Sequence, residues 1–288
     1  MVIRAPFLPL SVVLAFLGTC IAWYDGAFHL GYALLAFFGL LLAHISVDVL
    51  NEYFDYKSGV DLETQRTPFS GGSGALPSGL ISPRQALWLG VGTFLAIIPI
   101  GIYFTITRGW LLLPLLIVAA ICIIIYTPIL LKMGWPEWAP GLGMGTLPVL
   151  GVYFVQTTTY APAIVASIPS GIMVHNLLLL NEFPDTEADK KGGRRTLPIV
   201  AGKGKASIVY SVLTVIVYLW IIGGVVAGQM PVFSLLALLT LPFAVKAIRG
   251  VLKHQEMSRL VPAMANNVLV VLLTQLLLGI GYILAGIF

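Results

Sequence analysis

Residues 30–55 read LGYALLAFFGLLLAHISVDVLNEYFD. Up to Leu50 this stretch is almost entirely apolar, and it is interrupted only by His44 and Asp48 near its end. An apolar run of about 20 residues is long enough to cross the hydrocarbon core of a bilayer as a helix. Backbone polar groups in lipid must be satisfied within the segment, so helix is the element expected at this length. The stretch therefore predicts a transmembrane helix that ends in a polar phrase.

That polar phrase occurs twice in the chain. Residues 51–55 read NEYFD, and residues 181–185 read NEFPD at the end of another long apolar run. The chain has twelve acidic residues, and nine of them lie around the two phrases: Asp48, Glu52, Asp55, Asp61, Glu63, Glu182, Asp185, Glu187 and Asp189. Carboxylates at the mouths of membrane helices are unfavourable unless something binds them. We therefore expect function to reside at these two places.

The composition predicts a polytopic membrane protein. The 288 residues are 58% hydrophobic and only 10% charged, which is far more apolar surface than a soluble domain needs. Both cysteines, Cys20 and Cys122, fall inside apolar segments and are interpreted as small buried hydrophobes. We expect an all-α bundle of about nine transmembrane helices that forms a single domain over 1–288. The predicted spans are 6–24, 28–54, 85–107, 110–131, 138–157, 161–182, 206–227, 231–249 and 263–287.

The basic residues predict how the bundle is oriented. Cytoplasmic loops of membrane proteins carry an excess of Lys and Arg. With the N-terminus and Arg4 in the cytoplasm, fifteen of the sixteen basic residues fall on the cytoplasmic side and only Arg108 lies outside. The net charge of +4 is thus interpreted as topology and not as nucleic-acid binding. Both acidic phrases lie at the cytoplasmic face, where we expect the active site to open.

Two long cytoplasmic loops are expected to cap this site, at about 56–84 and 185–205. The first contains the run Ser-Gly-Gly-Ser-Gly at 70–74 and is long for a connection in a helix bundle, which favours a lid or binding loop over a plain turn. A flexible connector is the alternative. The second contains Gly-Lys-Gly-Lys at 202–205, and neither loop has the full pattern of a phosphate-binding P-loop.

Helical spacing selects particular residues from the two phrases. Residues three and four apart share one face of a helix, so His44, Asp48, Asn51 and Asp55 form one stripe and Asn181, Asp185 and Asp189 form another. Pro184 is expected to kink or end the second helix. Two roles stay open for His44: it supports the site residues, or it is a core histidine whose hydrogen bonds are satisfied within the fold. Leu178 stands at the position before the second phrase that Asp48 occupies before the first. The duplication therefore does not support Asp48 as a metal ligand.

The two stripes predict a site for Mg²⁺ and a diphosphate. Two facing stripes offer carboxylate and amide oxygens, the hard ligands that suit Mg²⁺ held jointly with substrate phosphates. Basic side chains near them suit the remaining phosphate oxygens. These are Lys57, Arg66, Lys132, Lys190, Lys191, Arg194 and Arg195. The alternative, ordinary solvated surface pairs, is favoured for Glu63, Glu187 and one of the two lysines at 190–191.

These residues resemble the motifs of the UbiA superfamily of intramembrane prenyltransferases. The resemblance rests on Asn51-x3-Asp55-x5-Asp61 and Asp185-x3-Asp189 at the ends of the second and sixth spans, and it covers essentially the whole chain. Further matching stretches are PSGLIS at 77–82 and YTPILLK at 126–132. The family implies an enzyme that binds an isoprenyl diphosphate through Mg²⁺, ionises it to an allylic cation and transfers that cation to an electron-rich acceptor.

The resemblance also implies roles for individual residues. The metal-diphosphate set is Asn51, Asp55, Asp61, Asp185 and Asp189, with Mn²⁺ as a substitute for Mg²⁺. Lys132 is expected to grip the diphosphate, and Tyr126 to face the cation or the acceptor. The substrate-binding set is completed by Asn181, Lys57, Arg66, Lys190 and Arg194. The four aspartates and Tyr126 are the expected catalytic residues.

The acceptor is predicted from a narrower similarity. The six-residue step from Asp55 to Asp61 and the run PVLGVYFVQT at 148–157 resemble the menaquinone-type branch, which prenylates 1,4-dihydroxy-2-naphthoate with loss of its carboxylate. The TPFS segment at 67–70 departs from the basic stretch expected there. Hydroxybenzoate, homogentisate and glycerol-ether lipid acceptors therefore stay as alternatives.

Two other classes of membrane protein compete with this interpretation. An ion-coupled transporter also shows internal repeats, but it would place its acids near the midplane and without phosphate-binding bases. A phosphatidyltransferase would need an Asp-Gly-x2-Ala-Arg sequence, which is absent. We expect a multi-pass enzyme of the cell (inner) membrane whose partners are the two substrates and the lipid bilayer, with no obligate protein partner and no nucleic acid.

Overall fold

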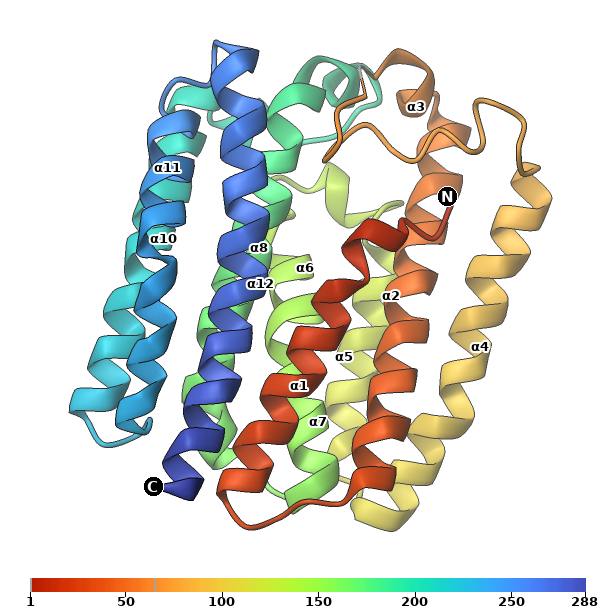
Figure 1. Ribbon diagram of the computed structural model, residues 1–288. Coiled ribbons are helices and arrows are strands. Elements are labelled where there is room, and N and C mark those ends of the chain that lie inside the picture. The colour runs from red at the N-terminus through yellow and green to blue at the C-terminus, as the bar shows by residue number, and fades with distance from the viewer. Residues whose placement is uncertain (1, 65) are drawn as a thin grey trace.

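The structure is a computed structural model that describes residues 2–64 and 66–288. Over these residues every regular element is a helix, and the long helices run roughly side by side in one bundle (Figure 1). The long helices and the segments continuous with them are α1 (Pro9–Tyr24), α2 (Leu30–Ser58), α4 (Pro83–Arg108), α5 (Leu112–Ile125), α6 (Trp138–Gly141), η3 (Leu142–Thr146), α7 (Leu147–Thr157), α8 (Ala161–Lys191), α10 (Lys203–Val226), η4 (Val232–Thr240), α11 (Leu241–Val251) and α12 (Met257–Ile287). The short helices are η1 (Ala5–Phe7), α3 (Val60–Glu63), η2 (Leu130–Lys132) and α9 (Leu197–Val200).

The membrane-spanning character predicted from the sequence is confirmed. Eight helical segments in the described part of the chain are long and apolar enough to cross a bilayer. The span expected at 110–131 is the shorter apolar helix α5, whose regular part ends at Ile125 because the chain then turns through Pro128 into η2. The cysteines at 20 and 122 are free and buried, as expected.

Both acidic phrases lie inside helices that are longer than predicted. Helix α2 continues to Ser58, and Gly59 then takes a φ of 81°, a left-handed conformation that suits glycine at a helix end. Helix α8 continues through Pro184 to Lys191, so of the two expected effects of Pro184, a kink or the end of the helix, the end is wrong. Proline removes one backbone donor, but Leu180 and Phe183 beside it are completely buried, and this packing holds the helix together.

The core of the bundle forms where α1 meets α7, α8 and α12. Its buried members include Leu14, Leu17 and Tyr153, none more than 1% exposed. Gly145, in the single π-helical turn η3, packs so closely on α8 that a Cβ there would lie 2.6 Å from the Cα of Gly171. This close approach brings η3 and α7 against α8 and shapes one wall of the cavity described below.

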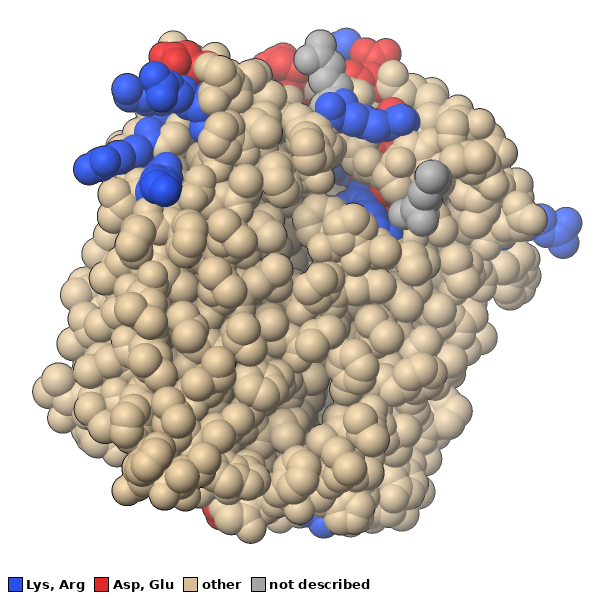
Figure 2. Space-filling model, viewed as in Figure 1, with Lys and Arg blue, Asp and Glu red and all other residues tan. Residues whose placement is uncertain are grey.

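Charged side chains are concentrated at one end of the molecule. Figure 2 shows the acids and bases gathered at the end where α3 lies, above a flank that is almost entirely uncharged. At the opposite end, Arg108 closes α4 by donating to the backbone carbonyls of Val155 and Gln156 over 2.7 and 2.8 Å. This concentration of charged side chains at one end of the bundle agrees with the distribution of basic residues predicted from the sequence.

Candidate active site

The two acidic phrases lie at the same end of the bundle, on α2 and α8. Asp55 and Asp189 are 5% and 1% exposed, and Arg194 lies between them. Its Nη1 donates to Asp189 Oδ1 over 2.7 Å, and its Nη2 forms an ion pair with Asp55 Oδ1. The stripe that ends in Asp55 and the stripe that ends in Asp189 are therefore joined through one guanidinium.

Arg194 reaches this place because the chain turns sharply after α8. Gly193 has a φ of 76°, and the backbone N–H of Arg194 donates to the carbonyl of Asp189 over 2.9 Å. Burial is the largest influence on the pKa of Arg194 and lowers it, but the charges of Asp55 and Asp189 together raise the pKa above its usual value. The guanidinium is thus a fixed positive charge among buried carboxylates.

The glycine-rich loop of residues 66–82 lies over the two phrases. The N–H of Gly71 donates to Asp185 Oδ2 over 3.1 Å. Gly72, with a φ of 70°, lies so near Asp61 that a Cβ would come within 2.8 Å of Oδ1. The loop therefore touches one acid from α8 and one from α3, and it is referred to below as the lid.

Asp61 is buried in this arrangement and is 5% exposed. Burial, followed by the negative charges of Asp55 and Glu52, raises the pKa of Asp61 to about 7. Positive charge beside this carboxyl would stabilise its anionic form.

Glu52 holds the lid in place, a role that the sequence interpretation missed. The side chain is completely buried, and its two oxygens accept from the N–H and the hydroxyl of Ser73, each over 2.7 Å. Arg4 also donates to Glu52 Oε1 over 2.7 Å. Arg4 was assigned only to topology. The available signal was the placement of Glu52 within the repeated phrase, one residue after Asn51.

The donor set fits a hard divalent cation. Asp61 Oδ2, Asp185 Oδ1 and Asn181 Oδ1 are buried and have no hydrogen-bond partner among residues 2–64 and 66–288, and unsatisfied buried oxygens are strongly unfavourable. Asn51 donates to Thr127 Oγ1 over 3.1 Å, which leaves its own carbonyl oxygen available. In the present arrangement, the described residues contain no group of three His, Cys, Asp or Glu side chains arranged to hold a metal ion. Arg194 supplies positive charge to Asp55 and Asp189 instead.

The other predicted basic residues lie around this centre and not in it. Lys57, Arg66, Lys132 and Lys190 are all exposed. Lys191 and Glu63 form a surface pair at 2.7 Å, with side chains that are 69% and 55% exposed, so the solvated-pair alternative holds for Glu63 and Lys191. Arg66 packs over Gly74, where a side chain would collide with its guanidinium.

The second capping loop is fixed to the segment around residue 135. Glu137 is completely buried and accepts from the N–H of Leu197 over 2.7 Å. His175, on α8, accepts from the indole N–H of Trp135 over 2.9 Å. The loop that carries Arg194 is therefore held by residues outside the two phrases, and Glu137 was not singled out from the sequence.

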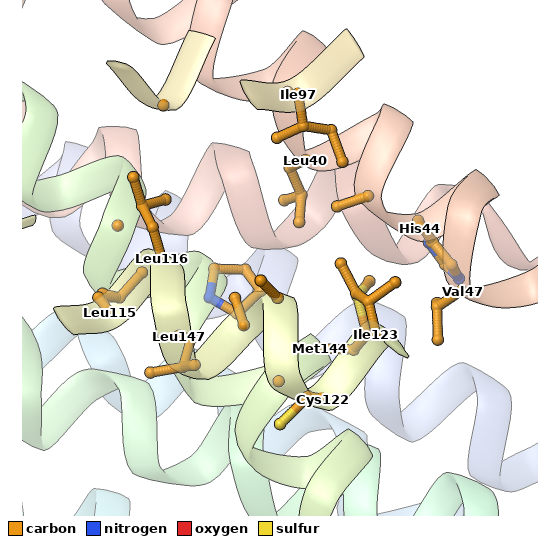
Figure 3. A pocket seen from close by; sticks show the side chains of 18 of the residues that line it. Leu40, His44, Val47, Ile97, Leu115, Leu116, Cys122, Ile123, Met144 and Leu147 are labelled. Carbon is orange, nitrogen blue, oxygen red and sulfur yellow. The ribbon is translucent and has the colours of Figure 1, made fainter. Parts of the chain in front are cut away.

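An apolar cavity of about 500 Å³ opens beneath the charged centre. Asn51, Asn181 and Tyr126 line its charged end, and Tyr126 is 9% exposed. From Asn51 the lining follows α2 down to Ala36, about 22 Å by the rise of an α-helix. Figure 3 shows Leu40, Ile97, Leu115, Leu116 and Ile123 around this space. A long apolar chain fits the cavity, with a charged head group at the end lined by the two asparagines.

Comparisons with known proteins agree with this geometry. The model of the UbiA prenyltransferase family matches residues 11–285. The chain is similar to "1,4-dihydroxy-2-naphthoate octaprenyltransferase" of Bacillus subtilis (strain 168), with 28% identity over 98% of this chain and 91% of the relative. It is also similar to "Digeranylgeranylglyceryl phosphate synthase" of Pyrococcus horikoshii, with 26% identity over 77% of each chain.

Solved structures share the fold. The apo structure of a UbiA homolog from Aeropyrum pernix K1 superposes with a TM-score of 0.70 at 16% identity, over 96% of this chain and 97% of the other. A UbiA homolog from Archaeoglobus fulgidus, bound to GPP and Mg²⁺, superposes with a TM-score of 0.60 at 14% identity, over 96% and 98%. These likenesses show that the chain shares the helix-bundle fold of the two UbiA homologs.

Proposed function

Because the chain belongs to the UbiA prenyltransferase family, we propose that it transfers a polyisoprenyl group from an isoprenyl diphosphate to 1,4-dihydroxy-2-naphthoate in an Mg²⁺-dependent reaction. The protein is an integral, multi-pass membrane enzyme. The observation that carries the proposal is the junction of the long apolar cavity with the buried carboxylates and Arg194. The similarity to the Bacillus naphthoate enzyme over nearly the full length supports the acceptor.

The proposed head-group site lies between α2, α3 and α8. Asn51, Asp55, Asp61, Asp185 and Asp189 would hold Mg²⁺ together with the diphosphate, since the unpartnered oxygens there suit a hard cation. Mg²⁺, when bound, supplies positive charge to the phosphate oxygens as the bond to the leaving group breaks. Mn²⁺, whose ligand preferences are similar, is expected to substitute. The Archaeoglobus homolog carries GPP and Mg²⁺, which supports this choice of head group and ion.

Arg194 is the residue proposed to stabilise the leaving diphosphate. Its guanidinium already lies among the buried carboxylates, with a pKa that keeps it charged. A preorganised positive charge in a site shielded from water lowers the energy of a transition state in which negative charge develops. Asn181, Lys57, Arg66, Lys132 and Lys190 are proposed to contact the remaining phosphate oxygens, and this requires the exposed lysines and Arg66 to turn inward.

The cavity is proposed to protect the allylic cation that ionisation produces. Its walls are apolar, and the lid of residues 66–82 covers its charged end through Gly71 and Ser73. Exclusion of water prevents hydrolysis of the cation before the acceptor attacks. Tyr126, at the junction, is proposed to face the cation with the negative side of its ring.

The proposal extends to the setting of the enzyme. The basic end of the bundle, with the N-terminus, is proposed to face the cytoplasm across the cell (inner) membrane. One catalytic domain is proposed to span residues 1–288, capped by the lid and by the loop that follows α8. The similarity to the Pyrococcus lipid synthase keeps a glycerol-ether acceptor as the second candidate.

A product assay tests the proposed reaction. The purified protein is supplied with Mg²⁺, radiolabelled prenyl diphosphates of several lengths and a panel of acceptors, and products are identified by mass. We expect a prenylated naphthalenediol that has lost the carboxylate, and no product after chelation with EDTA. Asp185→Asn is expected to abolish transfer, whereas Glu187→Gln, two residues further along the same helix but exposed, should leave it unchanged. A product formed only from a glycerol-ether lipid would assign the second candidate instead.

A further inference from the structure

A polar pair lies on the cavity wall one to two helical turns below the metal-diphosphate residues. His44 and Asp48 both come from α2 and both line the cavity. His44 Nε2 lies 3.7 Å from Asp48 Oδ2, and the two side chains are 6% and 15% exposed. In Figure 3, His44 and Val47 extend from the α2 ribbon among the apolar side chains.

His44 is held from its other side by α1. Its Nδ1 lies 2.8 Å from the hydroxyl of Ser11, which is completely buried. With Ser11 as the donor to Nδ1, the proton of the neutral imidazole is on Nε2 and points toward Asp48. The ring therefore has a fixed position and a fixed direction relative to the carboxylate.

Asp48 is the member of this pair without a direct hydrogen-bond partner. Its Oδ2 is buried and finds no donor within hydrogen-bonding distance in the described part of the chain. Arg4, the nearby cation that also lines the cavity, is bound to Glu52 over 2.7 Å. Phe7, Leu10 and Val47 line the same cavity with apolar surface. A buried carboxylate oxygen in such surroundings is strongly unfavourable unless a ligand satisfies it.

We propose that Asp48 binds the hydroxyl group of the aromatic acceptor and accepts its proton, and that His44 is the positioning residue that directs the carboxylate. This inference rests on the proposed function and assigns the acceptor subsite within it. The location is suitable because Asp48 lies one turn of α2 from Asn51, at the junction of the head-group site and the apolar cavity. An acceptor held there meets the reacting carbon of the prenyl chain.

The proton and electron movements balance without any further reactant. The allylic C–O bond breaks first, and its electron pair leaves with the diphosphate. The ring carbon that carries the carboxylate then bonds to the allylic cation, the hydroxyl on the neighbouring ring carbon becomes a carbonyl, and its proton moves to Asp48. Loss of the acceptor carboxylate as CO₂ then returns an electron pair to the ring, and the carbonyl oxygen takes the proton back from Asp48. A carboxylate that accepts and returns one proton is ordinary general acid–base chemistry.

The test pairs a change in the protein with a change in the acceptor. Asp48→Asn is expected to lower kcat about 100-fold while the KM for the prenyl diphosphate changes less than about threefold. An acceptor whose hydroxyl is methylated should be slow with the unaltered enzyme to a similar degree. The two changes together should lower kcat little more than either change alone, because each removes the same proton transfer. His44→Gln should lower kcat less, and its effect should vanish in the Asp48→Asn background.

Three results would overturn the assignment. One is an Asp48→Asn enzyme that retains kcat within threefold. Another is a combined loss of kcat, with both changes made, that equals the product of the two separate losses. The last is a large rise in the KM for the prenyl diphosphate, as is expected of Asp55→Asn. Asp48→Glu, which keeps the carboxylate, serves as a second variant and is expected to recover much of kcat. Failure of the proposed function is distinguished in the unaltered enzyme, which would then prenylate no hydroxyaromatic acceptor at all.

Discussion

The carboxylate of Glu52 accepts two hydrogen bonds from Ser73, one from its backbone N–H and one from its hydroxyl, each over 2.7 Å. Glu52 belongs to α2 and Ser73 to the lid, so this contact ties a transmembrane helix to the loop over the site. The ion pair with Arg4 adds the N-terminal segment to the same anchor. One buried acid therefore positions two pieces of chain above the cavity.

Loss of this anchor should release the lid. Glu52→Ala leaves Arg4, whose side chain is 23% exposed, without its partner, and it removes two hydrogen bonds to Ser73, each worth about 1 kcal/mol. We expect a lower melting temperature in detergent, faster proteolysis within residues 66–82 and a higher KM for the prenyl diphosphate. Glu63→Ala removes an exposed acid from the same face and should change none of these. An unchanged proteolysis pattern in Glu52→Ala would show that the lid is held by other contacts.

Arg194 should be far more important than its neighbour Arg195. Arg194→Ala leaves the buried carboxylates of Asp55 and Asp189 without their cation. It also removes the positive charge proposed to stabilise the leaving diphosphate. We expect kcat to fall at least about 100-fold, measured as prenyl transfer at saturating substrates. Arg195 is exposed, and Arg195→Ala should retain activity within about twofold. Similar losses in both variants would indicate a general effect of surface charge.

The closeness of the lid to Asp61 can be tested with two glycines of similar conformation. Gly72 and Gly79 have φ values of 70° and 72°, so alanine at either position imposes backbone strain of about 1 kcal/mol. Only at Gly72 would the new Cβ also approach Asp61, at 2.8 Å, whereas nothing lies within 4 Å of a Cβ at Gly79. Gly72→Ala should therefore raise the Mg²⁺ concentration needed for half-maximal activity, and Gly79→Ala should not. An equal change in both would assign the effect to strain.

The depth of the cavity should limit the prenyl chain. Gly151 lines the cavity on α7, where an added Cβ would lie 3.5 Å from Leu115 Cδ2. Gly151→Leu is expected to shift the preference toward shorter prenyl diphosphates, measured as the ratio of kcat/KM for long and short donors. Gly92→Leu, on an exposed part of α4 with open space around it, is the control. If Gly151→Leu leaves this ratio unchanged, the prenyl chain lies along another wall of the cavity.

Local sequence was sufficient for the helices and for the first selection of site residues. Apolar runs of the length of a bilayer predict spans wherever they occur, and spacing of three or four residues placed Asn51 and Asp55 on one face of α2. The ends of the helices were less predictable. Pro184 weakens a helix locally, but the buried neighbours Leu180 and Phe183 keep α8 intact, and such packing is not visible in the local pattern.

The sequence by itself determined that this protein is a membrane-embedded helix bundle with two acidic phrases, because hydropathy and helical periodicity act between near neighbours along the chain. Only the tertiary structure decided which acids serve which purpose. Glu52 and Arg4 are 48 residues apart, and Asp55 and Arg194 are 139 apart. Spacing tells which side chains share a face, but partners at such distances are chosen by the packing of whole helices. That packing pairs Asp55 with Arg194, ties Glu52 to the lid and places Asp48 on the cavity wall, all within three turns of one helix.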